Sequence, residues 1–435
     1  MIGDRIEVNI GGGLDVPIPR MVNVRQKFPA VKLDDVAGEV AAQFKRPDIR
    51  AKIKPGQTIA VGCGSRGVNH IADAALAVVN GIKGLGGKPF IFPAMGSHGS
   101  ATAEGQKQVL AGYGITESAM GCPVRATMDT VEVGRLEDGA PIHMDRFAAE
   151  ADGVVLINRI KPHTNFRAPI ESGILKMLVI GMGKIIGATT LHTYGMDTFG
   201  ELLPRVGRII MAKKNFLFGV GLVENAYDET ALLEAIPAER LFVREAELQA
   251  QAKEMMPRLC FDEIDALIID EMGKNISGAG FDPNITGRNN RCVDWNMKPR
   301  VQKIVVLGLT EETHGNATGM GLADVITMRL FRQMDVGPTY ANVITSAYLD
   351  GAAIPIIMNT EREAIQLAIK TVLRVKPLDC KIVRIRNTLA IGQIQVSEPL
   401  LEVVRRDPGQ FEVLGAPMAM KFDEQGNLQT AFRAA

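Results

Sequence analysis

Short apolar runs alternate with amphipathic stretches along the first 260 residues of the chain. Strands are predicted where a continuous apolar run lies between turn-forming residues, and helices where apolar residues recur every three or four positions. The predicted strands cover 58–62, 89–94, 153–160 and 216–223, and the predicted helices cover 70–83, 102–111, 145–150 and 238–256. This alternation is typical of an α/β domain with a largely parallel sheet.

The same pattern restarts after residue 260. Strands are predicted over 266–269, 303–309 and 381–385, and helices over 322–334 and 361–375. The Gly-, Asn- and Arg-rich segment 273–291 has little apolar periodicity, and a long irregular segment in a compact domain is more often functional than not. We therefore predict two α/β domains, residues 1–260 and 261–435, with the active site in the cleft between them.

Composition favours a small-molecule partner in a reducing compartment. The 435 residues are 46% apolar and 23% charged, with 49 basic and 49 acidic side chains. Such a balance provides no general field for nucleic acid or an anionic membrane. Residues 1–13 lack an apolar secretory core, the apolar stretch 173–188 is too short to cross a bilayer, and the five cysteines include no CxxC pair. We expect a cytoplasmic protein that binds neither nucleic acid nor membrane.

The first candidate motif is a GxGxxG sequence at 62–67, between a predicted strand and a predicted helix. Backbone amides at Gly64 and Ser65 could hold a phosphate there, as in a dinucleotide-binding fold. The second strand of such a fold should end in an acidic residue, but 90–92 reads Phe-Ile-Phe. Arg66 suits a substrate carboxylate better than a tight pyrophosphate loop.

Two histidines follow predicted strands. His98 lies in the segment 96–104, where Thr102 resembles a helix N-cap, and His163 follows the strand that ends near residue 160. Ligands of open α/β sheets bind at the carboxyl ends of the strands. Two imidazoles at such ends are suited to acid/base chemistry near neutral pH, although a single loop histidine is more often merely solvated.

A lysine and a later histidine form the next signal. Lys176 interrupts an apolar helical run, and His192 follows it sixteen residues later. A buried ammonium must reach the surface, pair, or react, because burying it unpaired is costly. Desolvation also makes the amine a better nucleophile. His314 lies on a predicted strand-end loop of the second domain, and no pair of histidines has zinc-motif spacing.

Taken in order, these segments resemble the nickel-dependent lactate racemase family. The resemblance implies that Arg66 holds the substrate carboxylate, that His98 and His163 act as an acid/base pair, and that His192 binds nickel. It also implies a nickel pincer nucleotide derived from nicotinic acid and attached covalently to Lys176, and hence cofactor-making enzymes as partners. The other residues that it places at the cofactor are Gly64, Ser65, Ser97, Gly173 and Gly181.

The implied reaction inverts C2 of a 2-hydroxy acid by hydride transfer. The polar character of 273–291 favours a sugar acid or another substituted acid over lactate, since a site built for hydroxyl groups rejects analogues that lack them. Residues expected to contact such a substrate are Lys274, Asn275, Arg288 and His314. Two alternatives remain open: an NAD(P)-dependent dehydrogenase that uses the 62–67 turn, and a non-catalytic protein that binds nickel or the cofactor.

Overall fold

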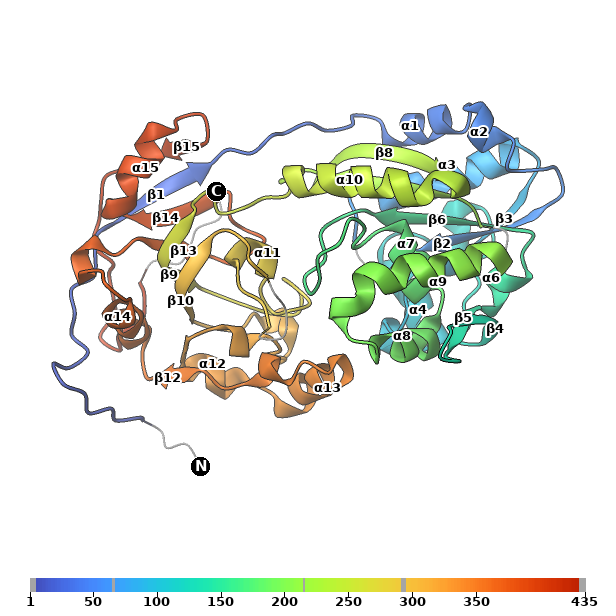
Figure 1. Ribbon diagram of the computed structural model, residues 1–435. Helices are drawn as coiled ribbons and strands as arrows, with labels where there is room; N and C mark the ends of the chain where they lie inside the picture. The colour runs from blue at the N-terminus through green and yellow to red at the C-terminus, as the bar shows by residue number, and fades with distance from the viewer. Residues whose placement is uncertain (1–4, 65–66, 214–215, 291–294, 430–435) are drawn as a thin grey trace. The chain divides into compact units, whose positions relative to one another are not determined.

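The structure is a computed structural model that describes residues 5–64, 67–213, 216–290 and 295–429. The chain divides into two compact units (Figure 1). The first unit comprises residues 29–256, and the second comprises residues 1–28 together with 257–435. A boundary near residue 260 was predicted, but the assignment of residues 1–28 to the first domain is corrected here. Strand β1 (Met21–Gln26) pairs with two strands of the second unit, so its hydrogen bonds place it there.

The first unit is built around a five-stranded sheet of order β3-β2-β6-β7-β8. Strands β3, β2, β6 and β7 run parallel, and β8 is antiparallel to β7. The strands are Thr58–Cys63 (β2), Lys88–Pro93 (β3), Gly153–Arg159 (β6), Phe216–Glu224 (β7) and Thr230–Pro237 (β8), and a separate hairpin consists of Thr130–Arg135 (β4) and Pro141–Asp145 (β5).

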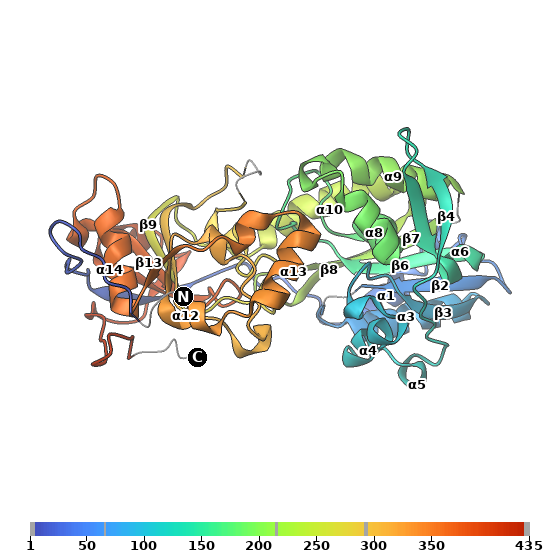
Figure 2. The same ribbon diagram turned by 90° about the horizontal axis from the view of Figure 1, so that it is seen from below.

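Helices cover both faces of this sheet. They are Val36–Gln43 (α1), Pro47–Arg50 (α2), Ile71–Gly84 (α3), Ala103–Gly112 (α4), Glu117–Met120 (α5), Arg146–Glu150 (α6), Ile174–Lys176 (α7), Lys184–His192 (α8), Phe199–Lys213 (α9) and Leu241–Met255 (α10). In Figure 2, α3 and α4 lie on one side of β2, β3 and β6, while α8 and α9 lie on the other. The core between α3 and the sheet includes Val78, Val79 and Ile91, all fully buried.

The second unit contains an eight-stranded sheet of order β12-β11-β10-β9-β13-β14-β1-β15. Its first five strands in this order are parallel, and the other pairings are antiparallel. Besides β1, the strands are Glu263–Ile269 (β9), Arg300–Val306 (β10), Val325–Thr327 (β11), Ile356–Met358 (β12), Ile382–Ile385 (β13), Gln393–Ser397 (β14) and Phe411–Val413 (β15). The helices are Pro283–Thr286 (α11), Met328–Gln333 (α12), Val336–Ser346 (α13), Glu361–Thr371 (α14) and Leu401–Arg406 (α15).

The predicted fold class is confirmed, since both units are α/β with largely parallel sheets. One predicted helix, 322–334, is wrong in its first half. Residues Val325–Thr327 form β11 between β10 and β12, and α12 begins only at Met328. Three consecutive β-branched residues, Val-Ile-Thr, favour a strand over a helical turn.

Candidate functional site

Three neighbouring strands of the first sheet place the candidate residues at one edge. Strands β3, β2 and β6 are parallel and adjacent, so the loops that follow them emerge from the same end of the sheet. His98 follows β3 and His163 follows β6, as predicted. The loop after β2 includes Ser65 and Arg66, which lie outside the described residues.

The His98 loop has an unusual backbone conformation. Gly99, Ser100 and Ala101 all have positive φ angles, of 63°, 55° and 52°. The Thr102 hydroxyl then accepts a hydrogen bond from the backbone N–H of Gly105 at 3.0 Å, which confirms the predicted N-cap of α4. Ser97 and His98 are exposed to solvent. His98 is therefore accessible to solvent on a tightly wound turn.

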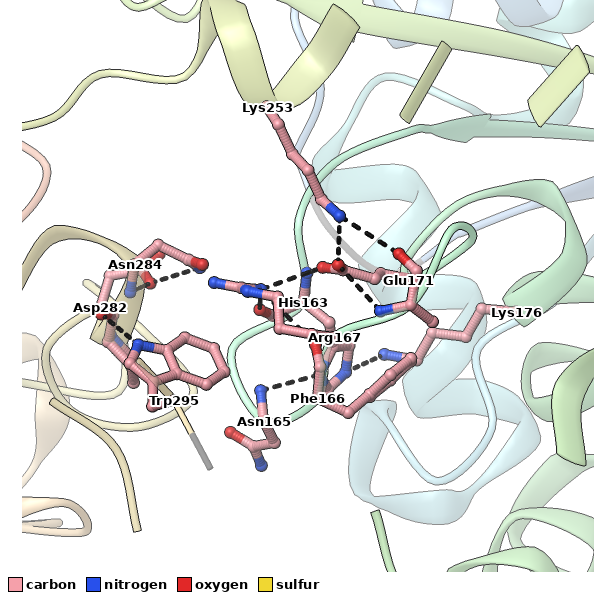
Figure 3. A network of polar contacts seen from close by, with 12 residues as sticks. His163, Asn165, Phe166, Arg167, Glu171, Lys176, Lys253, Asp282, Asn284 and Trp295 are labelled. Carbon is pink, nitrogen blue, oxygen red and sulfur yellow. Dashed lines mark hydrogen bonds and ion pairs between the residues drawn. The ribbon is translucent and has the colours of Figure 1, made fainter. Parts of the chain in front are cut away.

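The His163 loop is organised around a buried carboxylate, Glu171. The loop is closed at its base by the backbone bridge between Lys161 and Ser172. Glu171 Oε2 accepts a hydrogen bond from the His163 backbone N–H at 2.7 Å and lies 3.0 Å from Arg167 Nη1 (Figure 3). The other carboxylate oxygen, Oε1, lies 2.6 Å from Lys253 Nζ of α10. These contacts fix the backbone that carries His163. Sequence reasoning did not select Glu171, because its partners give no local pattern.

Lys176 and His163 are hydrogen-bonded to each other. The distance from Lys176 Nζ to His163 Nε2 is 2.7 Å, and His163 Nδ1 accepts a hydrogen bond from the Asn165 backbone N–H at 3.0 Å (Figure 3). Desolvation by burial, with a further contribution from Lys176 whenever that amine is protonated, holds the pKa of His163 well below its usual value. The imidazole is therefore neutral, and since Nδ1 is an acceptor, its proton is on Nε2. We infer that this proton points at Lys176 Nζ and favours the uncharged form of that amine.

His192 ends helix α8 within the same group of side chains. Its ring stacks on Phe199 at 5.5 Å between centroids, Phe199 contacts Phe166 at 5.7 Å, and Phe166 contacts His163 at 4.5 Å. Burial, with a further contribution from Lys176 whenever that amine is protonated, lowers the pKa of His192 to about 4. The ring is thus neutral at physiological pH, which is the form that binds metals. Within the described ranges, no group of three or more His, Cys, Asp or Glu residues could hold a metal ion.

The turn that carries Lys176 begins at a second buried carboxylate. Glu245 of α10 is fully buried, and its Oε2 accepts a hydrogen bond from the Leu175 backbone N–H at 3.0 Å. Burial raises the pKa of Glu245 to about 8. A Cβ atom on Gly173 would lie 2.0 Å from Glu245 Oε1, so only glycine lets the carboxyl group approach this helix start. Lys176 is followed by a π-helical turn, Met177–Gly181, and such turns are frequent at functional sites.

Two further glycines singled out in the sequence pack around this turn. A Cβ on Gly64 would lie 2.9 Å from Met177 Cε, and one on Gly181 would lie 2.6 Å from the Ala94 carbonyl oxygen. Their role in the structure is close packing of β2 and β3 against the segment that carries Lys176. Whether they also contact a cofactor stays a prediction.

The four residues proposed for substrate contacts lie in the second unit. Lys274 Nζ donates to the Gly278 carbonyl at 2.6 Å, and Asn275 Oδ1 accepts from the Thr310 hydroxyl at 2.7 Å. Arg288 donates to the carbonyls of Val301 and Gln302 at 3.0 Å and pairs with Asp324 at 2.5 Å, contacts that suit a structural role. His314 lies after β10 with a φ of 48°. The structure thus supports loop-stabilising roles and leaves the substrate roles as predictions.

Among the described residues, no single helix is long and apolar enough to cross a membrane. The segments Ile174–Gly181 and Lys184–His192 reach that length and composition only together, and they are bent by 103° at the break between them.

Comparisons with known proteins include one family model and two solved structures that are similar to the chain. Residues 69–193 match the family model of the lactate racemase N-terminal domain. The lactate racemase apoprotein from Thermoanaerobacterium thermosaccharolyticum has a similar structure, with a TM-score of 0.51 and 12% identity over 88% of this chain and 96% of that one. A protein from Thermotoga maritima aligns with a TM-score of 0.44 and 16% identity over 64% of this chain and 72% of that one. No curated protein matches the chain.

Proposed function

Since residues 69–193 match the family model of the lactate racemase N-terminal domain and the fold is similar to that of a lactate racemase, we propose that the chain is a member of that family and inverts C2 of a 2-hydroxy acid. The observation that carries this proposal is the hydrogen bond between Lys176 and His163, with His192 close enough to share their electrostatics. The cluster combines an amine that is nucleophilic in its uncharged form, an imidazole that can move a proton and an imidazole that can bind a metal.

The side chains of Lys176 and His192 suit the binding of a nickel pincer nucleotide. The uncharged Lys176 amine is the form that can be joined covalently to the cofactor, and the neutral His192 ring can supply one nitrogen to the nickel. When bound, the group supplies a hydride acceptor and donor. Enzymes that make the cofactor are then required partners, and we place the protein in the cytoplasm with them.

The chain's own residues would handle the substrate's proton and carboxylate. The C–H next to an ionised carboxylate is weakly acidic, so removal of hydride together with the hydroxyl proton is easier than abstraction of the carbon's proton. His98 and His163 follow strands on either side of β2, and we assign them the hydroxyl proton of the two enantiomers. Arg66 would bind the carboxylate and so fix the orientation of C2.

For the substrate we propose a sugar acid or another substituted 2-hydroxy acid. The loops after β9 and β10 carry Lys274, Asn275 and His314, whose polar groups suit hydroxyl substituents better than the methyl group of lactate. Arg288 would support this loop through its contacts with Asp324 and the backbone.

The test is to produce the protein together with cofactor-making enzymes and to measure its intact mass, nickel content and turnover. Aldonates, malate, aromatic 2-hydroxy acids and lactate would be incubated in D2O and followed by chiral chromatography and NMR. Inversion with C2 largely unlabelled is expected, because the hydrogen removed is the hydrogen returned. Rapid deuterium uptake at C2 would refute the hydride route, and fastest turnover of lactate would refute only the substrate.

The same preparation separates the other interpretations. Tight binding of free NAD together with oxidation of the acid would indicate a dehydrogenase. Nickel or cofactor bound without turnover of any 2-hydroxy acid would indicate a binding protein.

A further inference from the structure

A fully buried lysine, Lys184, lies beneath the His98 loop. It begins helix α8 with a φ of 53° and has no exposed side-chain surface. Its Nζ donates to the Pro93 carbonyl at 2.6 Å and to Gln106 Oε1 at 2.9 Å, and it lies 2.9 Å from Asp145 Oδ2. An ammonium group has three donors and no acceptor, so Lys184 donates to these two oxygens and forms a buried ion pair with Asp145.

Lys184 determines which way round the buried Gln106 amide lies. Because the ammonium can only donate, the Gln106 oxygen must face it, and the amide nitrogen must face the opposite way. That nitrogen donates to the carbonyls of Gly96 at 2.9 Å and His98 at 3.2 Å. One side chain of α4 therefore holds the backbone at Gly96 and at His98.

The held segment has a conformation that needs such support. Ser100 and Ala101 have positive φ angles, which non-glycine residues adopt rarely and keep only where the surroundings determine the backbone. Gly99 approaches α4 so closely that a Cβ would lie 2.6 Å from the Gln106 backbone nitrogen. The loop is thus held against α4 by its backbone and by the Gln106 side chain.

We propose that Lys184 and Gln106 are positioning residues that hold the His98 loop at a fixed place relative to helix α8, whose last residue is His192. Lys184 at the start of α8 connects to Gln106, and Gln106 connects to the His98 backbone. Reactions of this kind depend on sub-ångström placement of the acid/base group. The consequence for catalysis rests on the proposed function, whereas the structural connection does not.

The structural connection is tested by amide hydrogen exchange on the cofactor-free protein. Backbone N–H groups of Gly96, His98 and Ala101 are hydrogen-bonded to Gly181, Met95 and His98, so their protection reports on the loop. We expect Lys184→Met and Gln106→Met each to speed exchange of these amides by at least about tenfold, and the double variant to add little.

Gln26→Met is the matched control. Gln26 is also buried, donates to the carbonyls of Ile391 and Arg258 and accepts from the Cys260 N–H, but it belongs to the second unit. It should leave exchange at 96–101 unchanged. Unchanged exchange in Gln106→Met, or equal acceleration in the control, would overturn the proposal. If Lys184→Met does not fold, the exchange rates of Gln106→Met alone are sufficient to test the proposal.

The catalytic consequence is tested in the loaded enzyme. Gln106→Met should lower kcat by up to about 100-fold with KM little changed, because the substrate still binds while the base is misplaced. In a His98→Ala background the same substitution should cause almost no further loss, since Gln106 acts through His98. A full additional loss there would show a general structural role. Absence of any turnover in the unaltered enzyme would instead refute the proposed function and leave the exchange result standing.

Discussion

Lys176 Nζ and His163 Nε2 lie 2.7 Å apart, with the Asn165 N–H bound to the other ring nitrogen of His163. At this distance the two groups cannot both carry a charge without strong repulsion. We infer that the imidazole proton on Nε2 points at the amine and favours the uncharged form of the lysine. His163 thereby favours the form of Lys176 that can react covalently. The same contacts hold the His163 ring in place for proton transfer.

The first prediction concerns the reactivity of Lys176 in the cofactor-free protein. An uncharged amine forms imines that borohydride can trap, so pyridoxal phosphate at pH 7 should label Lys176 faster than an exposed lysine such as Lys45. His163→Ala removes the donor that favours the uncharged form and should slow this labelling. His143→Ala, which removes an imidazole bound to Thr130, is the control and should have no effect. Peptide mass spectrometry measures each site, and equal rates at Lys176 and Lys45 would contradict the assignment.

The second prediction separates the metal ligand from the acid/base pair. His192→Ala should lose or weaken nickel binding, because it removes a neutral imidazole nitrogen, whereas His98→Ala and His163→Ala should lose turnover and keep nickel once the cofactor is attached, even if attachment is slower in His163→Ala. Lys176→Ala should lose the covalent adduct in intact-mass analysis. Metal analysis of all four proteins gives the comparison. Equal nickel in all, together with an active His192→Ala, would remove the ligand role.

Much of this arrangement follows from the sequence, because the responsible signals are local. Apolar runs mark β2, β3 and β6, and the polar residues that follow them must lie at one sheet edge. Thr102 was recognisable as an N-cap from its position alone. The lysine in the apolar run was expected to reach the surface, pair or react, and it is hydrogen-bonded to His163.

The features that sequence reasoning missed depend on distant partners. In strand β1, Met21 pairs with Ser397, and no local sequence pattern predicts a pairing between residues so far apart in the chain. Glu245 caps a helix seventy residues earlier in the chain, and in the sequence it looks like an ordinary charge on an amphipathic helix. The buried network of Lys184 was hidden for the same reason, since its partners come from β3, α4 and β5.

The third prediction is a pH dependence of stability that arises from Glu245. Its pKa is about 8 in the folded protein and ordinary in the unfolded chain, so the folded state binds the extra proton between about pH 4.5 and 8. Stability should therefore fall as pH rises through this window, by up to about 1.4 kcal/mol per pH unit.

Glu245→Gln removes the titrating group but keeps an oxygen that can accept the Leu175 N–H. The unfolding free energy of this variant should therefore change less with pH in this window. Glu247→Gln on the same helix, at a half-exposed side chain paired with Arg244, should leave the slope unchanged. Urea unfolding at several pH values measures the difference. Parallel curves for Glu245→Gln and the unaltered protein would rule out a raised pKa.

The last prediction tests the close approach of Gly173 to this carboxyl group. In Gly173→Ala the new methyl group would lie 2.0 Å from Glu245 Oε1 and 3.1 Å from Ile160 Cγ1, so the carboxyl group must move and abandon the Leu175 N–H. We expect a loss of about 1–3 kcal/mol in unfolding free energy. Because Lys176 is on the turn that begins there, its labelling by pyridoxal phosphate should also fall. Gly84→Ala in helix α3 is the control, since a Cβ at Gly84 would have no neighbouring atom within 4 Å. Alanine at this position should stabilise the helix by roughly 0.5–1 kcal/mol. If Gly173→Ala proves as stable as the unaltered protein with Lys176 labelling unchanged, the glycine is not required for the cap, and the placement of Lys176 must depend on other contacts.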